Sequence, residues 1–164
     1  MKTKQNILFR KAAPRDLDAL CDLRAQLAHD PMDKQTTEYA PYSPQPDRIW
    51  INKCLHARNR VILIAERQNK ILAHAIILIE KASPKMRAYY TYDKKALLVH
   101  LYVDENNRRQ GIGSALMKYA FEYLKNLKVD FVDLECAPEN DKALTLYNKM
   151  GFRDIWIKKR FKLS

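Results

Sequence analysis

The clearest hydrophobic pattern in the chain has the period of a helix. Between residues 112 and 127, apolar side chains recur at spacings of three and four: Ile112, Ala115, Leu116, Tyr119, Ala120, Tyr123, Leu124 and Leu127. Lys118, Glu122 and Lys125 fall on the opposite face. This spacing predicts an amphipathic helix that buries one stripe.

The segment before this helix predicts a mostly buried strand. Residues 97–103 are apolar except for His100, and residues 104–107 are too polar to continue the strand. The connection that follows reads Arg108-Arg109-Gln110-Gly111-Ile112-Gly113-Ser114. A strand, a glycine-bearing turn and a helix N-terminus together form an anion cradle, because backbone N–H groups point outward and the helix dipole favours negative charge. An ordinary connection is the simpler interpretation of so short a motif, but the flanking arginines favour anion binding.

Weaker patterns predict the other elements. We expect strands over residues 7–10, 61–66, 71–80 and 131–136, helices over 14–28, 47–58 and 140–150, and one or two closing strands over 152–161. Residues 32–46 are rich in turns, and their prolines argue against regular structure. Residues 82–95 form a long polar connection.

This order of elements predicts an α/β fold. The expected sheet is mixed, with helices on both faces. At 164 residues the chain has the length of one domain, which we predict to span residues 1–164.

Charge is unevenly distributed along the chain. The formal net charge is +11, but residues 14–47 contain seven acids and three bases, so this segment carries −4 and the rest carries +15. A basic protein can bind nucleic acid or an anionic cofactor. The acidic segment and the lack of a nucleic-acid-binding motif argue against nucleic acid.

The remaining composition points to the cytoplasm. Cys21, Cys54 and Cys136 are odd in number and lack metal-ligand spacing, which is typical of reduced thiols. Neither a membrane-spanning run nor a signal peptide is recognisable. We therefore expect a cytoplasmic protein without a membrane or metal partner.

The chain resembles the GCN5-related N-acetyltransferases (GNAT family). Arg108-Arg109-Gln110-Gly111-Ile112-Gly113 matches the first family signature, and the second matches Asn140, Ala143, Leu146-Tyr147 and Gly151-Phe152. Glycine occurs only three times in this chain, as Gly111, Gly113 and Gly151, and each lies within these signatures. The resemblance covers residues 97–152 well and the rest only by the order of elements.

The resemblance implies a mostly antiparallel sheet with a splayed pair of parallel strands at the cofactor site. Acetyl-CoA would be the acyl donor, with no metal. The expected cofactor-binding residues lie on one strand, the turn and the last helix: Leu101, Tyr102, Val103, Arg108, Arg109, Gln110, Gly111, Ile112, Gly113, Ser114, Asn140, Ala143 and Tyr147.

Tyr147 is the expected general acid, since a phenol can protonate the departing thiolate. A core tyrosine is the alternative, because residues 143, 147 and 150 share one helical face.

The general base stays open. Where relatives often carry a glutamate or a histidine, this chain has Val99. His100 next to it is the candidate base, since a histidine suits deprotonation of an ammonium acceptor, but strand alternation places it on the other face. Glu38, Glu80 or a water chain to backbone carbonyls are the alternatives.

The acceptor is expected to be a small-molecule or peptide amine. At least one of Asp33, Glu38 and Asp47 should face its pocket, and Glu38 is the favoured residue. The leading hypothesis is direct acetyl transfer to a primary amine. A catalytically inactive acyl-CoA-binding regulatory protein is the alternative, and a homodimer is possible.

Overall fold

A five-stranded sheet forms the centre of the molecule. The computed structural model describes residues 6–29, 43–156 and 159. The sheet has the order β1-β2-β3-β4-β5. Its strands are β1 (Leu8–Lys11), β2 (Arg60–Arg67), β3 (Lys70–Lys81), β4 (Lys94–Val103) and β5 (Phe131–Leu134). Neighbours from β1 to β4 run antiparallel, whereas β4 and β5 run parallel. The predicted mixed, mostly antiparallel sheet is therefore confirmed.

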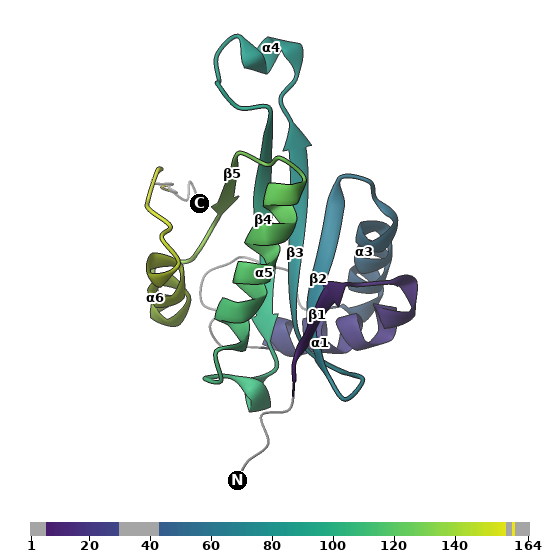
Figure 1. The fold of residues 1–164 in the computed structure, drawn as a ribbon. Helices are drawn as coiled ribbons and strands as arrows, with labels where there is room; N and C mark the ends of the chain where they lie inside the picture. The colour runs from purple at the N-terminus through teal and green to yellow at the C-terminus, as the bar shows by residue number, and fades with distance from the viewer. Residues whose placement is uncertain (1–5, 30–42, 157–158, 160–164) are drawn as a thin grey trace, which may run out of the picture.

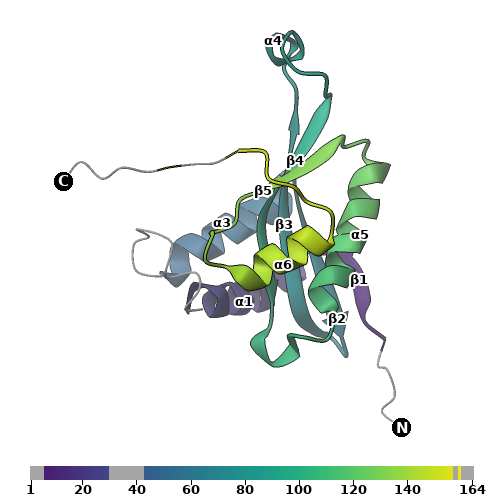
Figure 2. The ribbon, with the colours of Figure 1, turned by 90° about the vertical axis from the view of Figure 1, so that its left-hand side faces the viewer.

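Helices cover both faces of this sheet. The helices are α1 (Leu17–His29), α3 (Pro44–His56), α4 (Pro84–Arg87), α5 (Ile112–Asn126) and α6 (Asp141–Lys149), with short 3₁₀ turns η1 (Pro14–Asp16) and η2 (Glu105–Asn107). Helix α5 packs on one face, and α1 and α3 pack on the other (Figure 1). Helix α6 lies beside the β5 edge, as the rotated view shows (Figure 2).

Two hydrophobic clusters hold these layers together. On the α5 face, Leu116 and Met117 pack with Leu63 and Leu98 of the sheet. On the other face, Leu20 and Ile51 pack with strand residues that include Ile64. Burial of this apolar area is the main term that stabilises a layered fold.

The boundaries of several elements differ from the sequence predictions. Helix α3 begins at Pro44, so the argument that Pro44 and Pro46 exclude regular structure was wrong. Both prolines lie in the first helical turn, where the backbone N–H groups have no intrahelical partner in any case. The connection over residues 82–95 contains the short helix α4, and β5 ends at Leu134, two residues early.

The predicted closing strands are not formed in the described part of residues 152–161. Residues 152–156 form no strand, and Ile155 and Trp156 are exposed. Residues 157–158 and 160–161 lie outside the described residues.

The pairing between β4 and β5 stops halfway along β4. Its last pair joins Leu98 and Leu134. On the other side of β4, the register with β3 shifts at the same level, because Ile77 pairs with Leu98 while Ile76 pairs with His100. Val99 is thus the extra residue of a β-bulge. Strand β5 ends at the same level, and the chain after it turns away from β4 toward α6 (Figure 1).

Candidate functional site

An open backbone edge follows the β-bulge. Residues 100–103 of β4 pair with β3 on one side, and no strand among the described residues pairs with residues 99–103 on the β5 side. Val99 is 39% exposed at the start of this edge. Unpaired N–H and C=O groups of a strand can accept an extended ligand as if it were another strand.

The turn at the end of β4 has the backbone geometry of an anion cradle. Arg109 and Gly111 both adopt positive φ values, 63° and 78°, and Gly111 is the N-cap of α5. Left-handed residues placed among others make successive N–H groups converge on a bound anion. Arg109, Gln110 and Gly111 are exposed, so this turn lies at the surface of the molecule.

Buried polar side chains fix the start of this turn. The Asp104 Oδ1 atom accepts the N–H of Asn106 at 2.9 Å, and Arg67 Nη2 donates to Asn107 Oδ1 at 2.7 Å. Both Asp104 and Asn107 are buried. The turn is therefore held by side-chain bonds and does not rest on glycine alone.

Arg108 fastens the turn to the strand. Its Nε donates to the Val103 carbonyl at 3.0 Å, and its guanidinium lies 5.1 Å from the centre of the Tyr102 ring. These contacts give Arg108 a structural role in addition to the predicted role in anion binding, which no contact here tests.

Gly113 marks the place where three elements meet. A Cβ at this position would lie 3.5 Å from Val103 Cγ2 and 3.7 Å from Leu146 Cδ2, both ordinary contact distances. The first turn of α5, the end of β4 and the middle of α6 are therefore neighbours. The two sequence signatures, which are about 30 residues apart in the chain, meet at one site.

Helix α6 supplies the two polar residues of the second signature. Asn140 is its N-cap, and the Asn140 Oδ1 atom accepts the N–H of Ala143 at 3.1 Å. Tyr147 is partly buried against the α5-side cluster, and its ring lies 5.7 Å from that of Phe152. Burial, with a smaller effect of Cys136, raises the pKa of Tyr147 to about 12, so the phenol keeps its proton at neutral pH.

His100 points to the α1/α3 face of the sheet. Its ring makes an edge contact with Trp50 at 5.2 Å between centroids. Burial, and secondarily the charge of Arg24, lower the pKa of His100 to about 4. The imidazole is therefore neutral at pH 7, but so low a pKa makes it a weak base.

Of the three acids proposed for the acceptor pocket, only Asp47 lies within the described residues. Asp47 forms an ion pair with Arg24, with Nε and Oδ2 3.2 Å apart. Glu38 and Asp33 lie outside the described residues. Two further acids of the same segment form ion pairs, Asp16 with Arg10 and Asp18 with Arg48.

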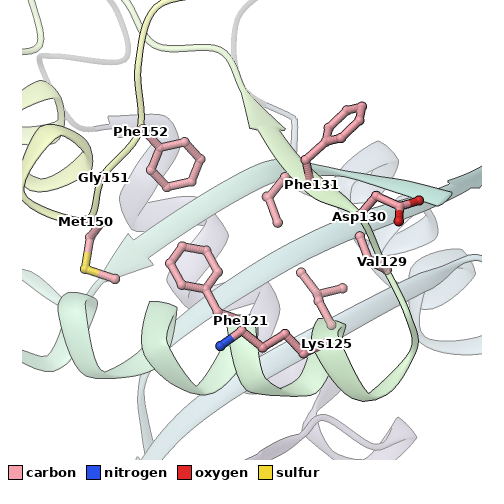
Figure 3. Close-up of a pocket in the computed structure, with 10 residues that line it drawn as sticks. Phe121, Lys125, Val129, Asp130, Phe131, Met150, Gly151 and Phe152 are labelled. Atoms are coloured by element: carbon pink, nitrogen blue, oxygen red, sulfur yellow. The ribbon is translucent and has the colours of Figure 1, made fainter. Parts of the chain in front are cut away.

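A separate pocket lies at the other end of α5. Its volume is about 280 Å³, and it is lined mainly by apolar side chains, including Phe121, Phe131 and Phe152 (Figure 3). None of the predicted cofactor or catalytic residues lines it. This pocket is therefore distinct from the candidate site at the bulge and the turn.

Metal and membrane chemistry find no support in the described residues. Within residues 6–29, 43–156 and 159, no group of three or more His, Cys, Asp or Glu side chains could hold a metal ion. The same residues contain no helix that combines the length and the apolar character needed to cross a bilayer.

The comparisons with known proteins agree with this geometry. The model of the acetyltransferase (GNAT) family matches residues 25–152. The chain belongs to this family. The matched region includes the bulge, the turn at Gly111 and helix α6.

Curated relatives of the chain are N-acetyltransferases. An N-alpha-acetyltransferase of Sulfurisphaera tokodaii is 28% identical over 60% of this chain and 59% of its own length. The [ribosomal protein bS18]-alanine N-acetyltransferase of Escherichia coli is 31% identical over 41% of this chain and 45% of its own length. The chain thus spans about half the length of the curated relatives it matches.

Solved structures share the fold at low identity. A mutant protein from Bacillus halodurans superposes with a TM-score of 0.78 at 21% identity, covering 96% of this chain and 99% of the other. A ribosomal-protein-alanine N-acetyltransferase from Brucella melitensis gives 0.71 at 17% identity, covering 97% and 100%. These likenesses concern the fold alone.

The sequence interpretation named Asp47 and His100 separately but missed the polar cluster that they form with Arg24 and His74. Arg24, Asp47 and His74 gather with His100 beneath α1 and α3, although they come from three separate elements. The sequence offered two signals for this cluster: Arg24 interrupts the apolar stripe of α1, and His74 interrupts the apolar run of β3. Neither residue stands out until the elements are packed together.

Proposed function

We propose that this protein is an acetyl-CoA-dependent N-acetyltransferase that transfers the acetyl group directly to a primary amine. The observation that carries the proposal is the position of the open β4 edge. It begins at the bulge and ends at an exposed turn with left-handed residues at the N-terminus of α5. A thioester donor with a pyrophosphate and an amide-bearing arm would fit both parts at once.

The turn would bind the charged end of the donor. The amides from Arg109 to Ser114 would hold the pyrophosphate, and the positive end of α5 would favour its charge. Residues 101–103 would pair with the amides of the pantetheine arm. Asn140 and Ala143, at the start of α6, would contact the arm from the opposite side.

Tyr147 would act as the general acid. Acetyl-CoA supplies the activated thioester, and the amine attacks its carbonyl carbon. A backbone N–H of β4 beside the bulge would stabilise the carbonyl oxygen. The Tyr147 hydroxyl would then give its proton to the departing thiolate, and its raised pKa keeps that proton in place at neutral pH.

The amine must also lose a proton, and His100 is the candidate residue nearest to the bulge that could accept it. His100 is neutral at pH 7, so it can accept a proton, but its pKa of about 4 makes it a weak base. We propose that a water held near His100 carries the proton out, with the imidazole as a hydrogen-bond acceptor.

A cytoplasmic location and a homodimeric state remain predictions from the sequence.

A catalytically inactive acyl-CoA-binding regulator is the second candidate. Val99 favours it, because this chain has no carboxylate at the strand position that relatives often use for the base. Acceptor-dependent release of free CoA thiol separates the two functions. The panel should include amino acids, polyamines, aminoglycosides and peptide N-termini, with the acetylated product identified by mass. Donor binding with no turnover of any acceptor would favour the regulator.

A further inference from the structure

The buried polar atoms that lack a hydrogen-bond partner are concentrated at one place. Within the described part of the chain, they are Arg24 Nε and Nη1, Asp47 Oδ2, and both ring nitrogens of His74. His74 is only 1% exposed. Buried polar groups in native proteins are nearly always paired, because an unmet group costs about 1–3 kcal/mol.

These residues belong to one cluster between the sheet and helices α1 and α3. His74 pairs across the strands with Tyr102, and Ile76 pairs with His100, so the two histidines lie diagonally on one face of the sheet. Arg24 is close enough to both imidazoles for its charge to lower the pKa of each. Asp47 contacts Arg24 from α3.

The ion pair in this cluster is poorly formed. Arg24 Nε and Asp47 Oδ2 are 3.2 Å apart, yet their geometry does not make a hydrogen bond. Two opposite charges that are mostly removed from water need good hydrogen bonds to offset the loss of hydration. A ligand that brings one anionic and one cationic group would satisfy both partners.

The cluster adjoins the site of the chemistry. Asp47 and Trp50 are three residues apart on α3 and therefore share a helix face. Trp50 contacts the ring of His100, and His100 directly follows the bulge residue Val99. An amine bound at Asp47 would therefore lie on the same face of the sheet as His100, next to the start of the open β4 edge.

From these contacts we infer that Arg24 and Asp47 form the acceptor-binding site for a zwitterion of the α-amino-acid type. Arg24 would bind the carboxylate, Asp47 would bind the ammonium group, and His74 would hydrogen-bond the carboxylate or a water beside it. This inference rests on the proposed function and names its substrate class. A simple amine would leave Arg24 unpaired, and a simple anion would leave Asp47 unpaired.

The test compares acceptors that differ only in the carboxylate. Amino acids, their C-terminal amides and the corresponding decarboxylated amines are assayed for CoA release with acetyl-CoA saturating. The amino acids should be preferred in kcat/KM by at least tenfold, and on the order of 100-fold where the carboxylate is fully buried. Equal kcat/KM values for amino acids and amines would overturn the inference and leave the acetyltransferase function standing.

Arg24→Met provides the second arm, because it keeps the length of the side chain and removes the charge. This variant should lose the preference for the carboxylate through a raised acceptor KM, with acetyl-CoA affinity unchanged. Arg48→Met is the matched control: Arg48 is an exposed arginine on α3 that pairs with Asp18, so its removal should leave the preference intact. A preference that survives Arg24→Met in a folded protein would contradict the assignment.

A binding measurement distinguishes failure of the proposed enzymatic function from failure of this inference. If no acceptor is turned over, binding of the same ligand pairs to the CoA-loaded protein is measured by calorimetry. Selective binding of amino acids would support the inference for a binding protein, while the enzymatic proposal would fail. A cluster filled only by water, with no selectivity between ligand pairs, would overturn the inference.

Discussion

Gly111 is the residue on which the geometry of the candidate phosphate turn depends most directly. It caps α5 with a φ of 78°, and a Cβ at this position would meet no atom within 4 Å. The space around Gly111 therefore tolerates a side chain, but its backbone conformation does not suit most L residues. Any effect of substitution should come from the backbone and not from a clash.

We predict that Gly111→Val weakens acetyl-CoA binding by roughly tenfold or more, because a β-branched residue resists the left-handed region. Calorimetric titration with acetyl-CoA measures the effect. Gly111→Asn should bind nearly as well as the wild type, since asparagine tolerates this conformation. Gly113→Ala is a second control, because its Cβ would make only ordinary contacts. Equal affinity for Gly111→Val and the wild type would remove this turn from the binding site.

Tyr147→Phe should lower kcat and leave acetyl-CoA affinity almost unchanged. The substitution keeps the ring packing against Phe152 and removes only the proton donor. General acid catalysis typically contributes about 10²–10⁴-fold, so a loss of that order is expected. Steady-state kinetics of thiol release, with a thermal unfolding scan as the check on folding, decides the matter. Full activity in the variant would return Tyr147 to a structural role.

His74, which is buried, and His100, which is half-buried, should make stability depend on pH. Their folded pKa values of about 3 for His74 and about 4 for His100 lie below the ordinary 6.5. Below pH 6.5 the unfolded chain therefore binds protons that the folded chain refuses, and the free energy of unfolding falls. From pH 7 to pH 5 the loss is roughly 2 kcal/mol for each histidine.

Urea unfolding at pH 7 and pH 5 tests this prediction. His74→Leu should show a smaller loss between the two pH values than the wild type. His56→Gln is the control, because His56 is exposed at the end of α3 and lies outside the cluster of Arg24, Asp47, His74 and His100. The same pH dependence in His74→Leu and the wild type would contradict the prediction.

At the scale of elements, the open edge of β4 makes the most specific prediction. Amide hydrogen exchange within residues 99–103 should slow when CoA binds, because the ligand would pair with backbone groups that have no strand partner on the β5 side. Residues 95–98 already pair with β5 and should change little. Mass spectrometry of peptides that separate the two halves of β4 measures the difference. Protection confined to residues 95–98 would argue against strand-like binding.

The elements that the sequence predicted well are those in which a periodic pattern and burial agree. The periodic helix after Gly111 and the strand before it are α5 and β4, and the β2–β3 hairpin turns through Gln68 and Asn69 with positive φ values of 52° and 60°. Prediction failed where local chemistry is ambiguous. Pro44 is compatible with both a turn and the first turn of a helix, and only the packing of α3 on the sheet decides between them.

The bulge at Val99 illustrates a different limit. The sequence of β4 gives no sign that one extra residue interrupts its pairing with β3, since no glycine marks the position. The bulge arises from the long-range register of two strands. The bulge determines where the open edge begins. The sequence signatures could therefore locate the site along the chain, but they could not predict the geometry of its strand edge.

At the scale of the whole molecule, the uneven charge has a local explanation. Of the four acids in residues 14–47 that the structure describes, three form ion pairs with arginines: Asp16, Asp18 and Asp47. Their charge is therefore largely neutralised where it arises, and the rest of the molecule keeps its strong positive balance. That balance suits a donor with several phosphate groups.

The polar cluster beneath α1 and α3 could not be predicted from the sequence, because it depends on how distant elements pack. Arg24, Asp47 and His74 come from two helices and a strand that are distant along the chain, and only the packed layers bring them together. Tyr147 and the Gly111 turn, in contrast, lie within short signatures that are recognisable without a structure.

The most direct test of the account is a crystal structure of the protein with acetyl-CoA. The account predicts that the pyrophosphate accepts hydrogen bonds from the amides of residues 109–114, that the pantetheine arm runs along residues 99–103, and that the Tyr147 hydroxyl faces the thioester sulfur. Acetyl-CoA bound instead in the pocket of Figure 3, or anywhere away from the bulge and the Gly111 turn, would contradict the central claim.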